Sequence, residues 1–398
     1  MSQATESAES IIEGLNAIHP EAFKSEHERQ KALVAAYALV SRLETPWETT
    51  ERICMNQPAL GACLKIAKDL QLFPKWHETG LFAQNSNSLA ELVGCQPELL
   101  VRILRHLATN NIIEHIAENT FKLTPFSIAL LQPHVAEWLT YMYDSVLPSF
   151  LSTPAFLRAT NYRNPSDAYN CPFQAGKNGF QGDMFQHFAE NPIEGAAFDA
   201  IMEGLVTARQ GSWLDLVPVR EHILAGAEAG PEASPLIVDV GGGIGHDLEK
   251  FRAAFPETAG RLYLQDLPGV ISRSICPEPV HKVPHDFFTP QPIKGARVYY
   301  LHSILHDWPD EKAAEILRMI VPAMKRGYSK LLVHDHVFSE GELSVHETTF
   351  DLNMMAVLAG KERTEGEWRA LLNSVGLQVV RVWRMEGVYH GVLEAEVV

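Results

Sequence analysis

The stretch Pro-Leu-Ile-Val-Asp-Val-Gly-Gly-Gly-Ile-Gly, from Pro235 to Gly245, decides the fold. A short apolar run is followed at once by glycines, which predicts a buried strand from Leu236 to Val240 and then a helix that begins near His246. Glycine lets the backbone approach a ligand closely, and the first turn of a helix offers N–H groups without partners. The stretch therefore predicts a ligand site at the end of a strand.

Short apolar runs alternate with helical patterns through the rest of the C-terminal part, at Leu262 to Leu264, Val298 to Leu301, Leu331 to Val333 and Val379 to Trp383. This alternation is typical of an α/β fold with a parallel sheet and helices on both faces. The segment Glu228 to Pro235 is a plausible domain boundary. We therefore expect three regions: 1–130, 131–230 and 231–398.

The N-terminal region is helical in pattern. Apolar residues recur at helical spacing over Glu21 to Leu43 and over Ile53 to Leu72. Next comes a helix, turn, helix pattern that begins at Ser88, followed by two short strands, Ile112 to Ile116 and Thr120 to Thr124. We interpret this segment as a winged-helix unit. DNA binding is the alternative, but the second helix carries few basic residues (Arg102, Arg105 and His106), so packing or dimerisation is favoured.

Composition limits the classes of function. The 398 residues are 46% hydrophobic, and 33 Lys and Arg against 49 Asp and Glu give a net charge of −16. Such a charge disfavours binding to nucleic acid or to anionic membranes. No apolar run approaches the roughly 20 residues that span a bilayer, and the first residues lack a secretory signal, so we expect a cytoplasmic protein. The five cysteines are scattered without a CxxC pair, which favours neither a disulfide framework nor a cysteine zinc site.

A polar stretch from Asn161 to Gly182, rich in Gly, Pro and Asn, predicts a loop or lid.

Two further strand ends carry candidate ligand groups. Asp266, about 20 residues after the glycines, suits the two hydroxyls of a ribose, and a capping or turn aspartate is the alternative. Asp286 and Phe287 could face an adenine ring with a carboxylate and an apolar surface. A nicotinamide dehydrogenase is disfavoured, because the sixth position of the glycine motif is His246 where the GxGxxG pattern has glycine.

His306 is a candidate base. It lies at the end of a predicted strand, just before a helix that Pro309 begins, and an imidazole with a pKa near 6.5 can accept a proton at neutral pH. Asp335 and Glu362 are two carboxylates that could hold the ring in one tautomer. A structural histidine and two surface carboxylates are the alternative interpretation.

Together these motifs resemble the class I S-adenosylmethionine-dependent O-methyltransferases of the caffeate and flavonoid type, with their natural-product relatives. The resemblance spans nearly the whole chain and rests on DVGGGIG at Asp239 to Gly245, DLP at Asp266 to Pro268, HDFF at His285 to Phe288, HDW at His306 to Trp308 and GKERT at Gly360 to Thr364. It implies a helical, winged-helix-like dimerisation region that contributes to the partner's pocket, and a Rossmann-like domain that binds S-adenosyl-L-methionine.

The resemblance also implies roles for single residues. The cofactor would be bound by Asp239, Gly241, Gly243, Asp266, Leu267, Asp286, Phe287 and His302. His306 would be the general base, with Glu362 and Asp335 as its supporting carboxylates, and no metal is required. Residues that would contact a small aromatic or polyketide-like acceptor are Met142, Tyr143, Phe185, Met202, Asp307, Asn353 and Met354.

The expected reaction transfers a methyl group to a hydroxyl, most simply a phenol, and releases S-adenosyl-L-homocysteine. Some relatives in this superfamily are pericyclases, which keep the cofactor but transfer no methyl group, and these are the main alternative. Such enzymes often replace the catalytic histidine, so the intact His306, Asp307 and Glu362 favour methyl transfer.

Overall fold

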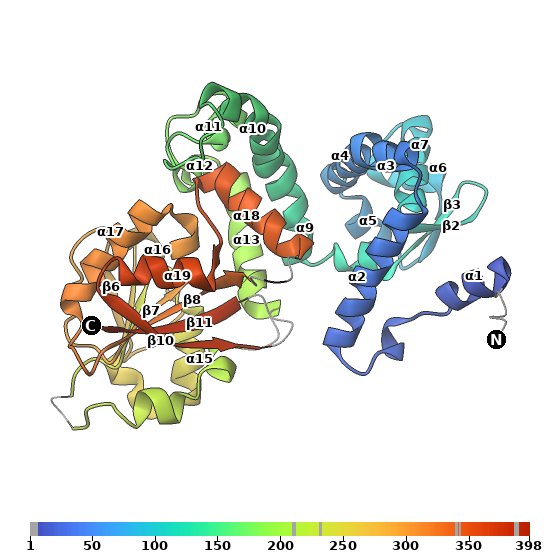
Figure 1. Cartoon of the computed structure of the whole chain (residues 1–398). Helices are drawn as coiled ribbons and strands as arrows, with labels where there is room; N and C mark the ends of the chain where they lie inside the picture. Colours follow the sequence, from blue (N-terminus) through green and yellow to red (C-terminus); the bar gives the residue numbers. More distant parts are fainter. Residues whose placement is uncertain (1–6, 209–211, 231–232, 339–340, 342–343, 386–389) are drawn as a thin grey trace, which may run out of the picture. The chain divides into compact units, whose positions relative to one another are not determined.

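The computed structural model describes residues 7–208, 212–230, 233–338, 341, 344–385 and 390–398 (Figure 1). The N-terminal segment as far as Pro58 is one compact unit, and the chain from Ala59 to Arg384 belongs to a second, together with the last strand. Pro231 and Glu232, within the expected boundary, and the first six residues lie outside the described residues. The division into 1–130, 131–230 and 231–398 stays a prediction.

An eight-stranded sheet organises the C-terminal part of the second unit. Its spatial order is β10-β11-β8-β7-β4-β5-β6, and β9 pairs with the end of β8. The strands are β4 (Ile237–Val240), β5 (Leu262–Asp266), β6 (His281–Pro284), β7 (Val298–His302), β8 (Lys330–Phe338), β9 (Arg363–Thr364), β10 (Leu377–Arg384) and β11 (His390–Val397). The predicted order of strands and helices is confirmed. The strand before Asp286 was expected without bounds, and β9 and β11 were not predicted.

The prediction of a parallel sheet is wrong at one edge. The central strands are parallel, but β11 runs antiparallel to both β8 and β10. Only a few residues separate Arg384 from His390, and a parallel connection would need a crossover of a dozen residues or more. The short connection therefore dictates a hairpin.

Both faces of the sheet are covered, as predicted (Figure 1). Val238 and Val240 pack in one buried cluster with α17 (Asp310–Ile320) and α19 (Glu365–Asn373). Ile237, which alternates with them along β4, packs in a second buried cluster that includes α15 (His246–Ala254). The glycine turn after β4 thus leaves a strand that is held from both sides.

The helices of the middle region form a further apolar cluster. They are α9 (Pro133–Thr140), a π-helical turn (Tyr141–Val146), α10 (Leu147–Ala159), α11 (Pro172–Gly176), α12 (Met184–Glu190) and α13 (Pro192–Ala208), and α18 (Val345–Leu358) packs among them.

The expected loop from Asn161 to Gly182 is partly wrong. It contains α11, and Cys171, Phe173 and Gln174 in it are buried. Gln174 Nε2 donates to the backbone oxygens of Ala168 and Gly182, at 2.8 and 2.7 Å. Hydrogen bonds from a side chain to the backbone of its own segment allow a polar stretch to pack in a buried position. Composition alone does not reveal such bonds.

Within the second unit, the predicted helices and hairpin before residue 130 are present. After α4 (Gln57–Asp69) and α5 (Leu72–Glu78) come α6 (Ser86–Val93) and α7 (Pro97–Thr109), then the hairpin of β2 (Ile113–Ala117) and β3 (Thr120–Leu123). A third strand, β1 (Ala83–Asn85), pairs with β3 and was not predicted. A short helix, α8 (Pro125–Ala129), follows.

The first unit holds α1 (Ala8–Asn16), α2 (Glu26–Leu43) and α3 (Pro46–Glu51). The helix predicted from Glu21 begins at Glu26, because the Ser25 side chain accepts a hydrogen bond from the backbone N–H of Glu28 and so caps the helix there. Across the described residues, no helix combines the length and the apolar character that crossing a membrane requires.

Candidate active site

The glycine turn has the backbone conformation that requires glycine. Gly241, Gly243 and Gly245 have φ angles of 70°, 61° and 100°, in the left-handed region that other residues rarely adopt. A side chain at Gly241 would also lie 2.7 Å from Cδ1 of Ile304. Asp266, at the end of β5, accepts hydrogen bonds from the N–H groups of Gly243 (2.9 Å) and Leu267 (2.7 Å). It therefore joins the ends of β4 and β5. This contact is the one expected of a turn aspartate, which was the alternative interpretation of Asp266.

Asp239 is a buried carboxyl group directed at this turn. Its carboxyl carbon lies 2.4 Å from where a side chain on Gly242 would begin, and its Oδ2 has no hydrogen-bond partner among the described residues. Burial raises the pKa of Asp239 well above its usual value, and Asp247 and Asp266 add to the effect. A buried carboxyl oxygen without a partner is costly, so the position suits a ligand that brings a cationic amino group. S-adenosylmethionine carries such a group, and the residues present fit it.

The predicted adenine-side residues follow the neighbouring strands. Asp286 is exposed, and its Oδ1 accepts a hydrogen bond from the backbone N–H of Phe288 at 2.9 Å. Phe287 is half-buried and lies 3.5 Å from the position of a side chain on Gly241. Leu267 is exposed after β5. The structure thus brings Phe287 to the glycine turn and leaves Asp286 and Leu267 open to a ligand.

His302, at the end of β7, belongs to a cluster that sequence analysis did not foresee. Its Nδ1 contacts Oδ2 of Asp247 in the first turn of α15, and its ring stacks on His334 with centroids 3.9 Å apart. Burial alone would raise the pKa of Asp247, but His302 holds it below the usual value. The two rings lie 18° from parallel. Acidic residues are common in the first turn of a helix, so nothing in the sequence indicated that Asp247 would contact His302.

His306, Glu362 and Asp335 come together, although they are far apart in sequence. His306 lies in a short turn, Leu305–Asp307, and its Nδ1 is 2.8 Å from Oε1 of Glu362. Oδ1 of Asp335 is 3.7 Å from the same nitrogen, which is too long for a hydrogen bond. Glu362 is therefore the direct partner of the imidazole. Because an ionised carboxylate only accepts hydrogen bonds, Nδ1 carries a proton and Nε2 is left as the basic nitrogen, 3.4 Å from Oδ1 of Asp307.

Burial and charge act in opposite directions on this cluster. Burial lowers the pKa of His306, but Asp335, Glu362 and Asp307 outweigh it, so the pKa lies well above its usual value. Burial raises the pKa of Asp307 to about 7 and also raises that of Asp335. Glu362 is pushed upward by burial, yet His306 brings its pKa far below the usual range. The stable state thus pairs an ionised Glu362 with a cationic His306.

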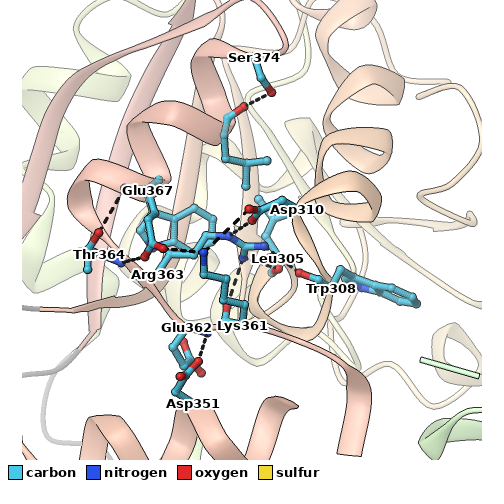
Figure 2. Close-up of polar contacts among 12 residues, drawn as sticks. Leu305, Trp308, Asp310, Asp351, Lys361, Glu362, Arg363, Thr364, Glu367 and Ser374 are labelled. Carbon is cyan, nitrogen blue, oxygen red and sulfur yellow. Dashed lines mark hydrogen bonds and ion pairs between the residues drawn. The ribbon is translucent and has the colours of Figure 1, made fainter. Parts of the chain in front are cut away.

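Arg363 holds the loop that carries Glu362 against the turn between Leu305 and Trp308 (Figure 2). Its guanidinium is fully buried and donates to the backbone oxygens of Leu305 (2.9 Å) and Trp308 (2.8 Å), which flank His306, and to Oδ1 of Asp310 (2.8 Å). The backbone N–H of Lys361 also donates to the oxygen of His306 at 2.9 Å. Arg363 lies within the GKERT motif, whose sequence alone indicated no role for this arginine.

The predicted substrate residues divide into two groups. Met142, Met202 and Met354 pack in the apolar cluster of the middle region, which also contains the buried Tyr141. Asn353 is buried beside Met354 in α18, and α18 contacts both the turn at Tyr141 and the turn at His306.

Tyr143 and Phe185 are partly exposed, and Phe185 contacts Phe198 edge to face. An apolar region therefore adjoins the His306 turn, and its methionine and aromatic side chains suit a flat acceptor.

Known proteins resemble this chain over most of its length. A family model described as an O-methyltransferase domain matches residues 222–378. A protein named O-methyltransferase mfmE, from Annulohypoxylon moriforme, is 52% identical over 98% of this chain and 95% of its own. O-methyltransferase mpaG of Penicillium roqueforti is 34% identical over 98% and 99%.

Among solved structures, OxaC in complex with sinefungin and meleagrin superposes with a TM-score of 0.82 at 27% identity, covering 98% of this chain and 97% of its own. A structure titled as a pericyclic reaction enzyme has a TM-score of 0.86 at 29% identity, covering 98% and 99%.

Proposed function

The chain belongs to the S-adenosylmethionine-dependent O-methyltransferases of secondary metabolism, and from this premise we propose that His306 removes the proton from the acceptor hydroxyl. The enzyme takes its methyl group from S-adenosyl-L-methionine and leaves S-adenosyl-L-homocysteine. The observation that carries the proposal is the 2.8 Å contact between Nδ1 of His306 and Oε1 of Glu362. It fixes the ring and leaves Nε2 available to a substrate.

The proposed steps use groups of this chain. A phenol has a pKa near 10 and is a weak nucleophile at neutral pH, so a positioned base contributes roughly 10²- to 10⁴-fold. Nε2 of His306 accepts the hydroxyl proton, and the resulting imidazolium is stabilised by Glu362 through Nδ1. When bound, the cofactor supplies an electrophilic methyl group. Asp239, Gly241, Gly243, Asp266, Leu267, Asp286, Phe287 and the backbone of His302 bind it in this proposal.

The raised pKa of His306 has a kinetic consequence. The base form requires that His306 lose its proton, and a pKa above the usual 6.5 moves this loss to higher pH. The rate at low substrate concentration should therefore rise with pH and level off above the raised pKa of His306. A rate independent of pH between 6 and 9 would contradict the assignment.

We also propose the class of acceptor: a small aromatic or polyketide-like molecule that binds against the apolar cluster. Met142, Met202, Met354, Tyr143 and Phe185 would contact its rings. Asp307 and Asn353 would meet its polar groups, because both lie at the border between that cluster and His306.

We propose that residues 1–130 form a winged-helix-like dimerisation region and that the enzyme is a homodimer. Helix α2 leaves a series of large apolar side chains exposed: Leu33, Val34, Tyr37, Val40 and Leu43. Such a surface is expected where another chain covers it. Light scattering at micromolar concentration should give twice the mass of the chain, and a monomer would contradict the proposal. The five free cysteines are in keeping with a reducing compartment, and we propose the cytoplasm.

The deciding experiment is mass spectrometry of the purified enzyme with S-adenosylmethionine and a panel of phenolic and polyketide acceptors. Methyl transfer gives a product 14 Da heavier together with equal S-adenosylhomocysteine. His306→Ala should abolish most of the methyl transfer while the affinity for the cofactor is kept. Asp266→Ala should do the reverse and weaken cofactor binding more than methyl transfer. An acceptor isomerised without change of mass, and without S-adenosylhomocysteine, would instead indicate pericyclic chemistry.

A further inference from the structure

A second histidine contacts the carboxylate that supports the proposed base. His336 lies on β8 and is 3% exposed, and its Nδ1 is 3.1 Å from Oε1 of Glu362. The same oxygen is 2.8 Å from Nδ1 of His306. The acid–base steps described above do not use His336.

One carboxylate oxygen has two lone pairs and can accept from two N–H groups. Oε2 of Glu362 and Nδ1 of His336 are both buried, and neither has a hydrogen-bond partner in the described part of the chain. Oε1 is hydrogen-bonded to His306 and lies in close contact, at 3.1 Å, with Nδ1 of His336. The Glu362 backbone N–H is held by Oδ1 of Asp351 at 3.0 Å. Both imidazoles also help to lower the pKa of Glu362 against the effect of burial.

The neighbours of His336 keep its ring in place. Its backbone oxygen accepts a hydrogen bond from Nε1 of Trp368 at 2.8 Å. Phe350 of α18 packs against the imidazole edge to face at 5.3 Å. The titratable groups that face the ring come from several elements: His390 of β11 at 4.0 Å, His346 of α18 at 6.0 Å, His306 at 6.1 Å, Glu362, and Asp335 of its own strand.

A buried N–H without a partner is costly, and the nearest acceptor for Nδ1 of His336 is Oε1 of Glu362, 3.1 Å away. We propose that His336 is a positioning residue: with a slight turn of its ring, Nδ1–H donates to Oε1 of Glu362, holds it toward His306 and limits the negative charge that Glu362 presents to the base. The inference deepens the proposed function and rests on His306 as the base. An N–H group that stabilises the ionised carboxylate takes part of its charge away from His306. His336 thus keeps the base form of His306 accessible at lower pH than Glu362 alone would.

Two substitutions separate this role from packing. His336→Phe keeps a ring but removes the N–H, whereas His336→Asn keeps an N–H donor near the place of Nδ1. With His336→Phe we expect the acid limb of kcat/KM to move to higher pH by on the order of one unit, because the uncompensated Glu362 stabilises the cationic His306. We expect kcat to fall roughly tenfold, the usual scale for one hydrogen bond to a charged group.

With His336→Asn the acid limb should stay near its wild-type position. Phe350→Leu is the matched control, since it loosens packing around the ring and leaves the N–H in place, and it should not move the limb. Binding of S-adenosylmethionine, measured by calorimetry, shows that each variant is folded. His336→Leu replaces His336→Phe if the latter binds no cofactor.

Two results would overturn the proposal: an unmoved acid limb in the Phe or Leu variant, or an equal shift in the Asn variant. Failure of the proposed function is a different outcome. If His306→Ala retains the wild-type rate, His306 is not the base, whatever the His336 variants do. In a Glu362→Gln background, His336→Phe should cause no further shift, because the carboxylate through which it acts is gone.

Discussion

Replacing Gly360 by alanine tests how closely the two loops of the candidate active site must approach. Gly360 follows α18, and a methyl group added to it would lie 2.5 Å from the backbone oxygen of His306 and 3.0 Å from the carbonyl of Asp307. Ordinary contacts begin at 3.4 Å, so the two loops must separate by about 0.9 Å. All of these atoms belong to the backbone, and no change of rotamer can relieve the contact.

The expected effect on catalysis follows from that displacement. A shift of about 1 Å in a catalytic group can cost on the order of 10²-fold in rate, and we expect this for kcat in Gly360→Ala. Overpacking should also lower the free energy of unfolding by about 1–3 kcal/mol. The glycine turn proposed to bind the cofactor is a separate loop, so the Kd for S-adenosylmethionine should change by less than about threefold.

The assay measures formation of S-adenosylhomocysteine at saturating acceptor, with the cofactor Kd from calorimetry and stability from urea unfolding. Gly61→Ala is the matched control, because nothing lies within 4 Å of the added methyl group and alanine favours the helix α4 in which Gly61 lies. Wild-type kcat in Gly360→Ala would refute the argument that His306 depends on this contact. A large loss of cofactor affinity would show that the loops do not act separately.

Two further predictions concern the same loops. Arg363→Lys keeps the charge but loses the planar group that reaches both Leu305 and Trp308, so kcat should fall roughly tenfold or more. The control is Arg369→Lys. The guanidinium of Arg369 is partly exposed, so this variant should be near wild type in the same assay. Glu362→Gln removes a negative charge that raises the pKa of His306, so the acid limb of kcat/KM should move to lower pH and its plateau should fall; an upward move would contradict the charge assignment.

The sequence was most informative where local chemistry decides the structure. Apolar runs next to glycines predicted β4 and its turn, because a left-handed turn against a helix leaves little choice other than glycine. Pro309 with its acidic neighbours predicted the start of α17, which begins at Asp310. By contrast, β6 contains a proline and polar residues, and its strand form depends on pairing with β5 rather than on its own pattern.

Distances between loops could not be predicted in this way. Asp335 and Glu362 were both candidates in the sequence, Glu362 as the closer match to the family motif. Only the packing of β8 against the loop after α18 makes Glu362 the hydrogen-bond partner of His306. Arg363 gave no signal because its acceptors are backbone oxygens, which every residue has. His336 was likewise hidden, since alternation along a strand says which face a side chain takes and nothing about what it meets there.

The candidate active site is best understood as a set of charges arranged around one carboxylate. Removing that carboxylate should lower the pKa of His306, and removing the imidazole on its other side should raise it, so Glu362→Gln and His336→Phe should move the acid limb in opposite directions. General loosening of the fold would move the limb alike in both variants, or in neither. Opposite shifts would therefore show that Glu362 sets the basicity of His306 and that His336 acts through it.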